Sequence, residues 1–173
     1  MIDVEKISIK KISSEHNSEI QNFKCTDKPE VEAFLKNSAL KYHENSLAKT
    51  HLVFYGQEFI GYFSIFTDHV TVPRSKRESK SWDVTSIIEK QMFPSIRIHF
   101  MGVSDIHRKK GFGTYLLYIA LATCQDLSES VGCTFIALEA LDGTVDFYKK
   151  YNFEVLSRPK EGFTNMIFKL DEL

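Results

Sequence analysis

One short segment of the chain combines basic residues with glycines in a way that suits a phosphate-bearing ligand. Its members are Arg108, Lys109, Lys110, Gly111, Phe112, Gly113 and Thr114. A helix that begins at Thr114 leaves its first backbone N–H groups unpaired and carries partial positive charge at that end, so an anion is favoured there. The two glycines let a ligand approach the backbone, and the three cations add charge beside it. The segment therefore predicts a diphosphate-binding turn, and an ordinary surface turn with solvated cations is the alternative.

A predicted strand and a predicted helix flank this turn. The apolar run from Ile96 to Val103 indicates a buried strand. After the turn, apolar residues recur at helical spacing up to Gly132, far enough for a helix that crosses over a sheet. This stripe comprises Leu117, Ala120, Leu121, Cys124, Leu127 and Val131. Residues 133–138 are almost continuously apolar, as in a strand covered on both faces, and we expect them to pair in parallel with the strand at Ile96.

The N-terminal half predicts a strand, a helix and a hairpin. Short apolar alternation over residues 2–12 indicates the strand, which a polar loop follows. Asp27 as N-cap and Pro29 in the first turn indicate the start of the helix. Two further strands, residues 51–55 and 58–66, flank a glycine turn, so they are expected to form an antiparallel hairpin.

The segment between the hairpin and the buried strand is polar. Over residues 70–80 the apolar pattern stops, and four cations stand against one anion, which indicates an exposed loop. Contact of this loop with an RNA backbone is the alternative interpretation. Residues 83–92 then predict a short helix that ends before Pro94.

The C-terminal segments predict a helix and two strands. The helix is expected over residues 144–151 and ends at Asn152, because asparagine tolerates the left-handed backbone of a helix end. The two strands are expected at residues 153–156 and 163–170.

Length and composition indicate one folded domain. The chain has 173 residues, of which 43% are hydrophobic, so a single core over residues 1–173 is expected without disulfides or metal. The net charge of −1 gives no global attraction to nucleic acid. The three cysteines lack metal-ligand spacing and indicate reduced core residues. The first residues show no signal sequence and no run is long enough to span a membrane, so a cytoplasmic location without membrane attachment is expected.

Two motifs resemble those of the GNAT superfamily of acyl-coenzyme A dependent N-acyltransferases. Residues 108–113 match its pyrophosphate loop, Arg/Gln-x-x-Gly-x-Gly/Ala, between a strand and a long helix. Residues 147–153 match its segment Phe-Tyr-x-x-x-Gly-Phe, with Asn152 in place of the glycine, and asparagine is the next residue to accept those backbone angles. The resemblance covers most of the chain. It implies an α/β (α+β) fold with a mixed, largely antiparallel sheet, a central parallel strand pair and flanking helices.

The resemblance also implies the donor and the residues that bind it. Acetyl-coenzyme A (acetyl-CoA) is the expected cofactor, with its pyrophosphate on residues 108–114. Its pantetheine arm is expected along Met101, Gly102 and Val103, where peptide groups bond it as an added strand would. A backbone N–H near Met101 or Val103 also suits the oxyanion that forms when an amine attacks the thioester.

By the same resemblance, Tyr148 is the expected general acid, which protonates the coenzyme A thiolate. A phenol with an ordinary pKa of about 10 is protonated at neutral pH, and an aromatic packing role is the alternative. No motif marks the general base. His99 is one candidate because strand alternation places it with Arg97 and Met101 on one face, and a core histidine is its alternative. Glu139, at the end of the next strand, is the other candidate, with a solvated carboxylate as its alternative.

The implied reaction is transfer of acetyl from acetyl-CoA to a primary amine of a small molecule or peptide, by direct attack in a ternary complex. No cysteine lies in either motif, which disfavours an acyl-enzyme, and no metal-binding motif is present. Residues 23–25, 32–35 and 47–50 are similar to the branch of toxins that acetylate aminoacyl-tRNA. A toxin-type enzyme with tRNA as substrate and an antitoxin as partner is therefore one alternative, and a non-catalytic acyl-CoA binding module is another. A homodimer through the hairpin or the terminal strands is compatible with the sequence.

Overall fold

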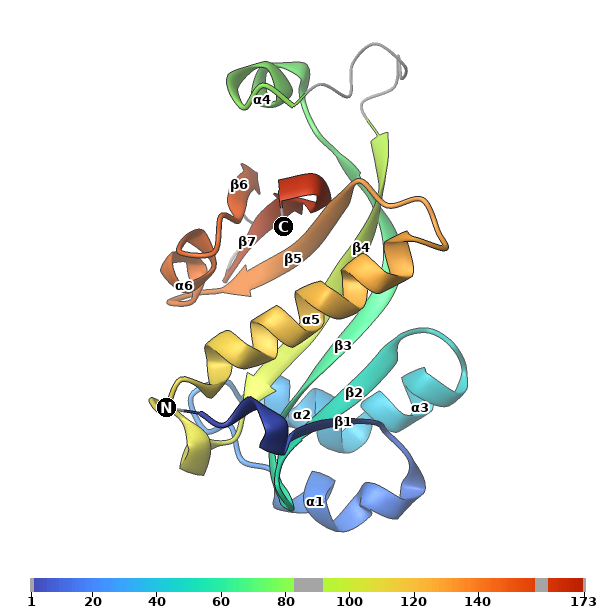
Figure 1. Ribbon diagram of the computed structural model, residues 1–173, viewed down its shortest axis with the longest axis vertical. Coiled ribbons are helices and arrows are strands. Elements are labelled where there is room, and N and C mark those ends of the chain that lie inside the picture. The colour runs from blue at the N-terminus through green and yellow to red at the C-terminus, as the bar shows by residue number, and fades with distance from the viewer. Residues whose placement is uncertain (1, 83–91, 158–161, 173) are drawn as a thin grey trace. The chain divides into compact units, whose positions relative to one another are not determined.

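The computed structural model describes residues 2–82, 92–157 and 162–172, which contain a seven-stranded sheet and helices (Figure 1). The strands are β1 (Ile7–Lys11), β2 (Lys49–Tyr55), β3 (Glu58–Thr71), β4 (Met92–Val103), β5 (Phe135–Leu141), β6 (Glu154–Ser157) and β7 (Phe163–Lys169). The helices are α1 (Asn17–Asn22), α2 (Pro29–Asn37), α3 (Ala39–Glu44), α4 (Arg74–Ser79), α5 (Phe112–Ser128) and α6 (Val145–Lys149). Short 3₁₀ turns cover Val4–Lys6, Ser14–His16, Asp105–His107 and Leu170–Glu172.

The sheet has the strand order β1-β2-β3-β4-β5-β7-β6. The pairs β1–β2, β2–β3, β5–β7 and β6–β7 are antiparallel. The neighbours β4 and β5 are parallel, and α5 provides the crossover connection that a parallel pair needs. The predicted fold class, a largely antiparallel sheet with a central parallel pair and flanking helices, is therefore confirmed.

The chain divides into two compact units, which we describe separately. The first comprises Met1–Phe66 and Ile98–Thr123, and the second comprises Thr67–Arg97 and Cys124–Leu173. The expectation of one domain over residues 1–173 stays a prediction. None of the described helices combines the length and the hydrophobicity that a membrane span requires.

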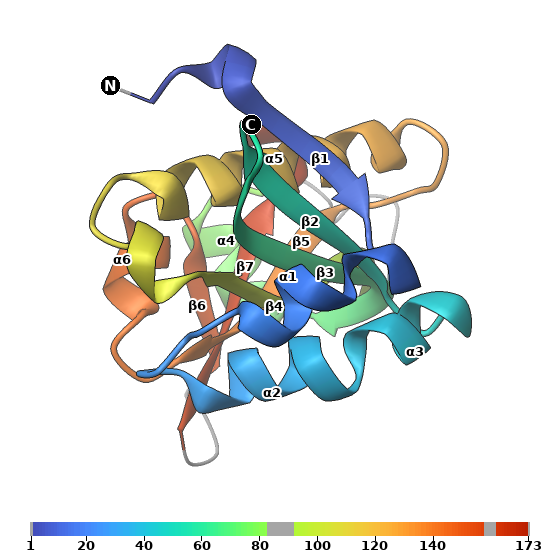
Figure 2. The same ribbon diagram turned by 90° about the horizontal axis from the view of Figure 1, so that it is seen from below.

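In the first unit, helices cover both faces of the strands. Figure 2 shows α1, α2 and α3 on one face and the N-terminal turns of α5 on the other. The ring of Tyr62 packs edge-on against Phe23 with centroids 5.6 Å apart, and stacks on Phe34 at 6.4 Å. The hairpin of β2 and β3 is confirmed, with Gly56 (φ +62°) in its turn. The largest fully buried side chains of this unit are Phe23, Leu35, Leu52, Ile60, Tyr62, Phe63, Leu116 and Leu117.

The helix predicted after Asp27 forms, but its N-cap differs from the prediction. α2 begins at Pro29 with Lys28 at the N-cap, and Ser38 (φ −130°) separates it from α3. The Asp27 carboxylate pairs with Arg108 instead of capping the helix. The N-cap interpretation was wrong, because a long-range ion pair takes the carboxylate that the local pattern assigned to the helix.

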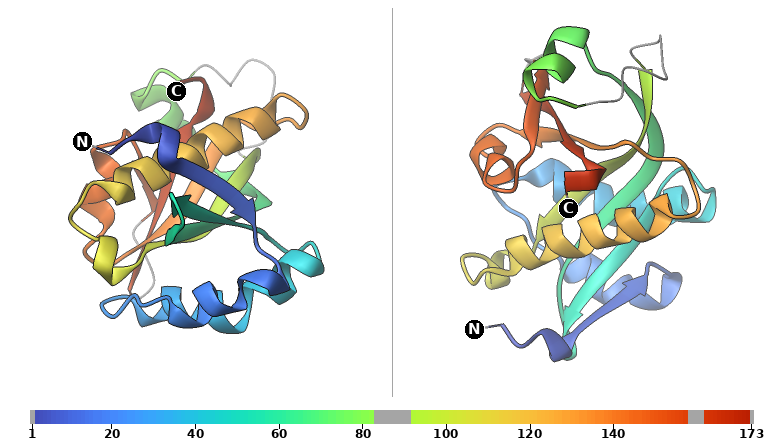
Figure 3. Two further views of the ribbon diagram at one scale, coloured as in Figure 1. Left: turned by 60° about the horizontal axis from the view of Figure 1, so that its bottom comes forward. Right: turned by 45° about the horizontal axis from the view of Figure 1, so that its top comes forward.

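In the second unit, β7 lies between β5 and β6, with antiparallel register on both sides (Figure 3). The core of this unit includes an aromatic group in which Phe135 contacts Trp82 at 5.3 Å and Phe93 at 5.6 Å between ring centroids. Asn152 follows α6 with φ +62°. The left-handed helix end predicted at this asparagine is therefore confirmed.

The expectation of an exposed loop over residues 70–80 was wrong, because the segment contains the end of β3 and the helix α4. Arg77 is buried, and its guanidinium carbon lies 5.4 Å from the centre of the Phe93 ring. Lys76 pairs with Glu154 at 3.0 Å. Phe93 and Glu154 lie outside the segment, so the sequence of residues 70–80 alone showed only an excess of cations. That excess suggested a solvated loop.

The strand before the turn is longer than predicted. β4 begins at Met92 instead of Ile96, and Pro94 lies within it. A proline inside a strand removes one ladder hydrogen bond, which is why it suggested a boundary. The short helix expected over residues 83–92 lies, apart from Met92, outside the described residues.

Candidate active site

The predicted diphosphate turn lies between β4 and α5 in the first unit. A 3₁₀ turn over Asp105–His107 follows β4, and α5 begins at Phe112, two residues before the predicted start at Thr114. Two residues with left-handed backbone shape the turn, Lys109 at φ +57° and Gly111 at φ +89°. A side chain at Gly111 would be strained whatever the space around it. The glycine is thus required by the turn itself.

The start of α5 presents backbone N–H groups next to this turn. The Thr114 N–H donates to the Gly111 carbonyl at 3.1 Å, which closes a tight first turn. Helix geometry leaves the N–H groups of Phe112 and Gly113 without carbonyl partners within α5, and the helix dipole adds partial positive charge. The two lysines of the turn and Gly111 are exposed. Donors, positive charge and an uncovered backbone together fit a diphosphate.

Arg108, the first residue of the motif, binds groups of the protein itself. Its Nε donates to the Val103 carbonyl at 3.2 Å, and its Nη2 donates to the Cys25 thiol at 2.9 Å. The guanidinium also pairs with Asp27 and, at 3.3 Å, with Asp105. Arg108 therefore ties the turn to the segment before α2, while its predicted contact with the diphosphate stays a prediction.

The Cys25 thiol beside Arg108 is not set up as a nucleophile. Burial raises the pKa of Cys25 to about 11, although the charge of Arg108 acts in the opposite direction. The thiol therefore keeps its proton at neutral pH, and a protonated thiol is a poor nucleophile. All three cysteines are free, and Cys25 and Cys124 are buried, as the sequence indicated for core residues.

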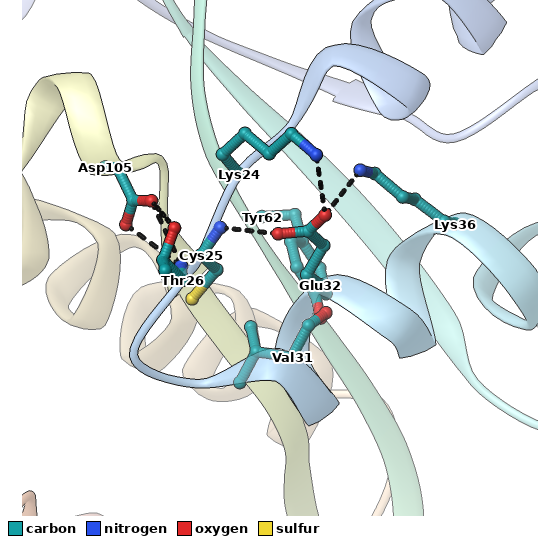
Figure 4. Close-up of polar contacts among 8 residues, drawn as sticks. All are labelled: Lys24, Cys25, Thr26, Val31, Glu32, Lys36, Tyr62 and Asp105. Carbon is teal, nitrogen blue, oxygen red and sulfur yellow. Dashed lines mark hydrogen bonds and ion pairs between the residues drawn. The ribbon is translucent and has the colours of Figure 1, made fainter.

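Two carboxylates hold the segment before α2 from opposite sides (Figure 4). Asp105 accepts hydrogen bonds from the Thr26 backbone N–H at 3.0 Å and from its hydroxyl at 2.6 Å. Glu32, in the first turn of α2, accepts from the Cys25 N–H at 2.9 Å and pairs with Lys36 at 2.6 Å. The hydrogen bonds from Lys36 and from Cys25 lower the pKa of Glu32 to about 2. The segment is therefore fixed by charge-assisted bonds at neutral pH.

The strand end expected to hold the pantetheine arm lies close to α2 and β3. A Cβ atom on Gly102 would overlap the Val31 side chain, and one on Gly61 would overlap the Gly102 carbonyl. The Tyr62 hydroxyl donates to the Val31 carbonyl at 2.6 Å, which fixes α2 on β3 (Figure 4). Residues 101–103 are half-buried. Glycine at these two positions therefore allows the close packing of α2, β3 and β4.

His99, one candidate base, lies in an aromatic cluster of the first unit. Its ring centroid is 4.9 Å from that of Phe34, 5.3 Å from Phe66 and 4.6 Å from Phe100. The Tyr42 ring stacks on it at 6.1 Å. The ring is therefore packed among aromatic side chains, although the residue is only half-buried, and a role as general base stays a prediction.

Glu139, the other candidate base, lies on β5 in the second unit with a largely exposed side chain. Its Oε1 is 3.6 Å from Nη1 of Arg97, and Arg97 Nε donates to Asp68 at 2.5 Å. The sequence placed Arg97 on a strand face but gave no sign of Asp68, because pairs between separate strands leave no local pattern. The base role of Glu139 is likewise still a prediction.

Tyr148, the expected general acid, belongs to α6 in the second unit. Its backbone carbonyl accepts a hydrogen bond from the Phe153 N–H at 3.2 Å. This bond spans Asn152, which has a left-handed backbone and occupies the glycine position of the motif, so Asn152 ends the helix. Its ring packs edge-on against Phe147 and Phe153, with centroids 5.2 and 5.6 Å apart. Burial raises the pKa of the phenol above its ordinary value. The hydroxyl therefore carries its proton at neutral pH, as a general acid must.

The predicted residues thus form two groups. In the first unit, the strand end 101–103, the turn 108–114 and the segment before α2 form one connected arrangement through Arg108 and Asp105. In the second unit, Glu139 joins the Arg97 ion pairs, and Tyr148 anchors the end of α6.

Comparison with solved structures shows the same fold in several toxins. A tyrosine-to-phenylalanine mutant of KacT matches with a TM-score of 0.80 and 18% identity, over 96% of each chain. AtaT complexed with acetyl-methionyl-tRNAfMet matches with a TM-score of 0.76 and 18% identity, also over 96% of each chain. AtaTR bound with AcCoA matches with a TM-score of 0.75 and 20% identity, over 97% of this chain and 96% of that one.

Comparison with protein families identifies the family to which the chain belongs. A search of curated proteins found no significant match. The acetyltransferase (GNAT) family matches residues 14–153, a range that contains both the turn after β4 and the segment of Tyr148. The chain therefore belongs to the acetyltransferase (GNAT) family.

Proposed function

We propose that the protein transfers the acetyl group of acetyl-CoA to the α-amine of an aminoacyl-tRNA. Family membership supports acetyl transfer, with acetyl-CoA as the donor. The likeness to AtaT complexed with acetyl-methionyl-tRNAfMet, over 96% of this chain, supports the acceptor. This acceptor is one member of the wider class of primary amines that the sequence indicates.

The observation that carries the proposal is the left-handed Gly111 directly before α5, at the position of the family's pyrophosphate loop. Acetyl-CoA supplies an acetyl group activated as a thioester and carries the diphosphate that this turn fits. The N–H groups at the start of α5 and the two exposed lysines are suited to hold that diphosphate. Arg108 keeps the turn in place through Val103 and Asp105. The peptide groups of residues 101–103 are expected to bind the pantetheine arm.

Tyr148 is expected to supply the proton that the departing sulfur needs. Its half-buried phenol keeps its proton at neutral pH because partial burial disfavours the charged phenolate. Proton donation by a positioned side chain contributes on the order of 10²- to 10⁴-fold to a rate. The helix end at Asn152 and the rings of Phe147 and Phe153 limit the orientations open to this side chain.

The acceptor amine needs little help to lose its proton. The α-amino group at a peptide N-terminus has an ordinary pKa of about 7.7–8.0, and an esterified amino acid likewise has no free carboxylate beside its amine. A useful fraction of such an amine is therefore neutral near pH 7.5. The Glu139 carboxylate is then expected to accept the proton released on attack, directly or through water. The packed imidazole of His99 is the less accessible of the two candidates.

Companion proteins form a second part of the proposal. AtaT has been solved bound to the C-terminus of the antitoxin AtaR, and KacTA has been solved as a complex with DNA. We expect this chain to bind an antitoxin as well, with growth arrest on expression that the antitoxin relieves. A homodimer remains compatible with the fold, in which β1 and β6 are the edge strands.

A thiol-release assay with acetyl-CoA tests the function. We expect coenzyme A to be released with a charged tRNA pool, and only at background rates with the same pool after deacylation. Release with polyamines or peptides but not with charged tRNA would contradict the tRNA acceptor and leave a general amine acetyltransferase. Tight acetyl-CoA binding without release across all amines would indicate a non-catalytic binding module.

A further inference from the structure

The second unit contains a cavity of about 230 Å³ that is lined by residues of several strands, including β5 and β7. At roughly 30 Å³ for each water molecule, this space is comparable to about eight waters. Its apolar lining includes Ala137, Leu156 and Ile167, and its polar lining includes His69, Arg97 and Asn165. The cavity therefore has an apolar part and a polar part, which is the usual composition of a small-molecule site.

Arg97 is the charged group of this cavity, and its hydrogen bonding is incomplete. Its Nε donates to Asp68 at 2.5 Å, whereas its Nη1 lies 3.6 Å from the nearest Glu139 oxygen, beyond hydrogen-bond distance. Nη1 is buried and has no hydrogen-bond partner within the described residues. A buried donor without an acceptor is costly, so this guanidinium is suited to a ligand oxygen.

The charge around Arg97 argues against an anionic ligand. Partial burial acts to raise the pKa of Asp68, but the hydrogen bond from Arg97, the hydrogen bond from the His69 N–H and the charge of Arg97 together outweigh it. The pKa is therefore lowered, and Asp68 is ionised at neutral pH. Glu139 adds a second carboxylate, and the His69 ring lies 3.9 Å from Asp68. Two carboxylates around one guanidinium leave a negative excess, which favours an amine and disfavours a carboxylate or phosphate.

The cavity and Glu139, which lies beside its Arg97, together match the groups of an esterified amino acid. On β5 and β7, Glu139 is paired directly with Asn165, and Ala137 with Ile167, so the four residues share one face of the two strands. An amine near Glu139 therefore lies two positions along the strand from the apolar floor at Ala137. This spacing of about 7 Å is similar to the distance between the α-amine of an amino acid and the end of its side chain, when that side chain is of medium size.

We infer that this cavity binds the aminoacyl group of the acceptor, an inference that rests on the proposed function. The α-amine lies toward Glu139, the ester carbonyl oxygen accepts a hydrogen bond from Arg97, and the side chain packs on Ala137, Leu156 and Ile167. The Asp68 ion pair positions Arg97 for this contact. Apolar side chains of medium size are favoured over acidic ones, because Asp68 and Glu139 already place two carboxylates beside Arg97.

Binding of methioninamide to the full chain tests the inference without requiring turnover. This probe has a free α-amine, a carbonyl group and an apolar side chain, and it lacks a carboxylate. We expect its addition to shift the methyl NMR signals of Ile167, which lines the cavity, and not those of Ile136, which is buried on β5 outside the cavity lining. Glutamic acid 1-amide, with an acidic side chain, is expected to bind at least tenfold more weakly.

Two variants locate the binding site, and one matched variant controls for them. Arg97→Gln removes the donor and Ala137→Leu fills the cavity, and each should weaken methioninamide binding by tenfold or more. Arg74→Gln changes an exposed arginine that pairs with Glu78 on α4, and it should bind as the wild type does. A thermal melt of each variant separates loss of binding from loss of folding.

The outcomes distinguish this inference from the proposed function. If Ile167 does not shift, or if folded Arg97→Gln and Ala137→Leu bind methioninamide and acetylate charged tRNA as the wild type does, the inference is overturned and the proposed function stands. If the probe binds as expected but charged tRNA is not acetylated, the amine-binding cavity stands and the tRNA acceptor is overturned.

Discussion

Thr26 donates both its backbone N–H and its hydroxyl to the carboxylate of Asp105, which lies 79 positions later in the chain. The hydroxyl bond lowers the pKa of Asp105, so the carboxylate stays ionised at neutral pH. Asp105 also pairs with Arg108 in the turn before α5. The segment before α2 and the predicted diphosphate turn are therefore held together by one polar network.

Removal of Arg108 should loosen this network. Arg108→Gln removes the cation paired with Asp27 and Asp105 and the donor to the Val103 carbonyl. Because Asp27 is largely exposed, the expected loss of stability is about 1 kcal/mol. We expect a lower melting temperature and a KM for acetyl-CoA raised by about tenfold. Lys110→Gln, at an exposed position in the same turn, should leave the melting temperature unchanged. Equal melting temperatures for the two variants would argue against the anchoring role of Arg108.

Removal of the Tyr148 hydroxyl should slow turnover without weakening donor binding. Tyr148→Phe keeps the ring contacts with Phe147 and Phe153 but removes the proton donor. We expect kcat to fall on the order of 10²-fold or more, while the Kd for acetyl-CoA by calorimetry changes little. Tyr151→Phe, three residues later, is the matched control. An unchanged kcat in Tyr148→Phe would remove this tyrosine from the mechanism.

A methyl group at Gly102 should destabilise the first unit by overpacking. The added Cβ would overlap the Val31 side chain, and overpacking of this kind costs about 1–3 kcal/mol. Val31→Ala makes room, so the double variant should recover part of the loss, measured as a coupling free energy in a double-mutant cycle of urea melts. Gly132→Ala, where an added Cβ meets no atom within 4 Å, is the control. Strictly additive effects would contradict the contact between α2 and β4.

Acid should weaken the protein partly through Glu32. Its folded-state pKa of about 2 lies below its ordinary value of 4.5, so its stabilising contribution is fully present above pH 4.5 and is lost as the pH falls toward 2. Glu32→Gln should therefore unfold more readily at pH 7 and show a shallower loss of stability between pH 4.5 and pH 2. Glu15→Gln, at an exposed position, should keep the wild-type slope. The same slope in Glu32→Gln would exclude this carboxylate as a source of acid sensitivity.

The local features of the site could be predicted from the sequence. Gly111 and Asn152 adopt the left-handed backbone that their positions in the two motifs require, because such angles depend on the residue type itself. The apolar alternation of β2 and β3 likewise indicated their hairpin. These signals lie within a few residues of one another, so they need no knowledge of distant partners.

The polar partners of the site could not be predicted in this way. Neither the pairing of Arg108 with Asp27 nor that of Arg97 with Asp68 was indicated by the sequence. Each pair joins segments far apart in the chain, and many carboxylates of similar local context compete for each cation. Such choices are made by packing of the whole fold, which leaves no pattern in a short stretch of sequence.

The most direct test of the central claim is mass spectrometry of the terminal nucleoside released from charged tRNA after incubation with the protein and acetyl-CoA. We predict an aminoacyl-adenosine heavier by one acetyl group, formed by the wild type, strongly reduced with Tyr148→Phe and absent without acetyl-CoA. An unmodified aminoacyl-adenosine in the presence of wild-type protein that binds acetyl-CoA would contradict the claim.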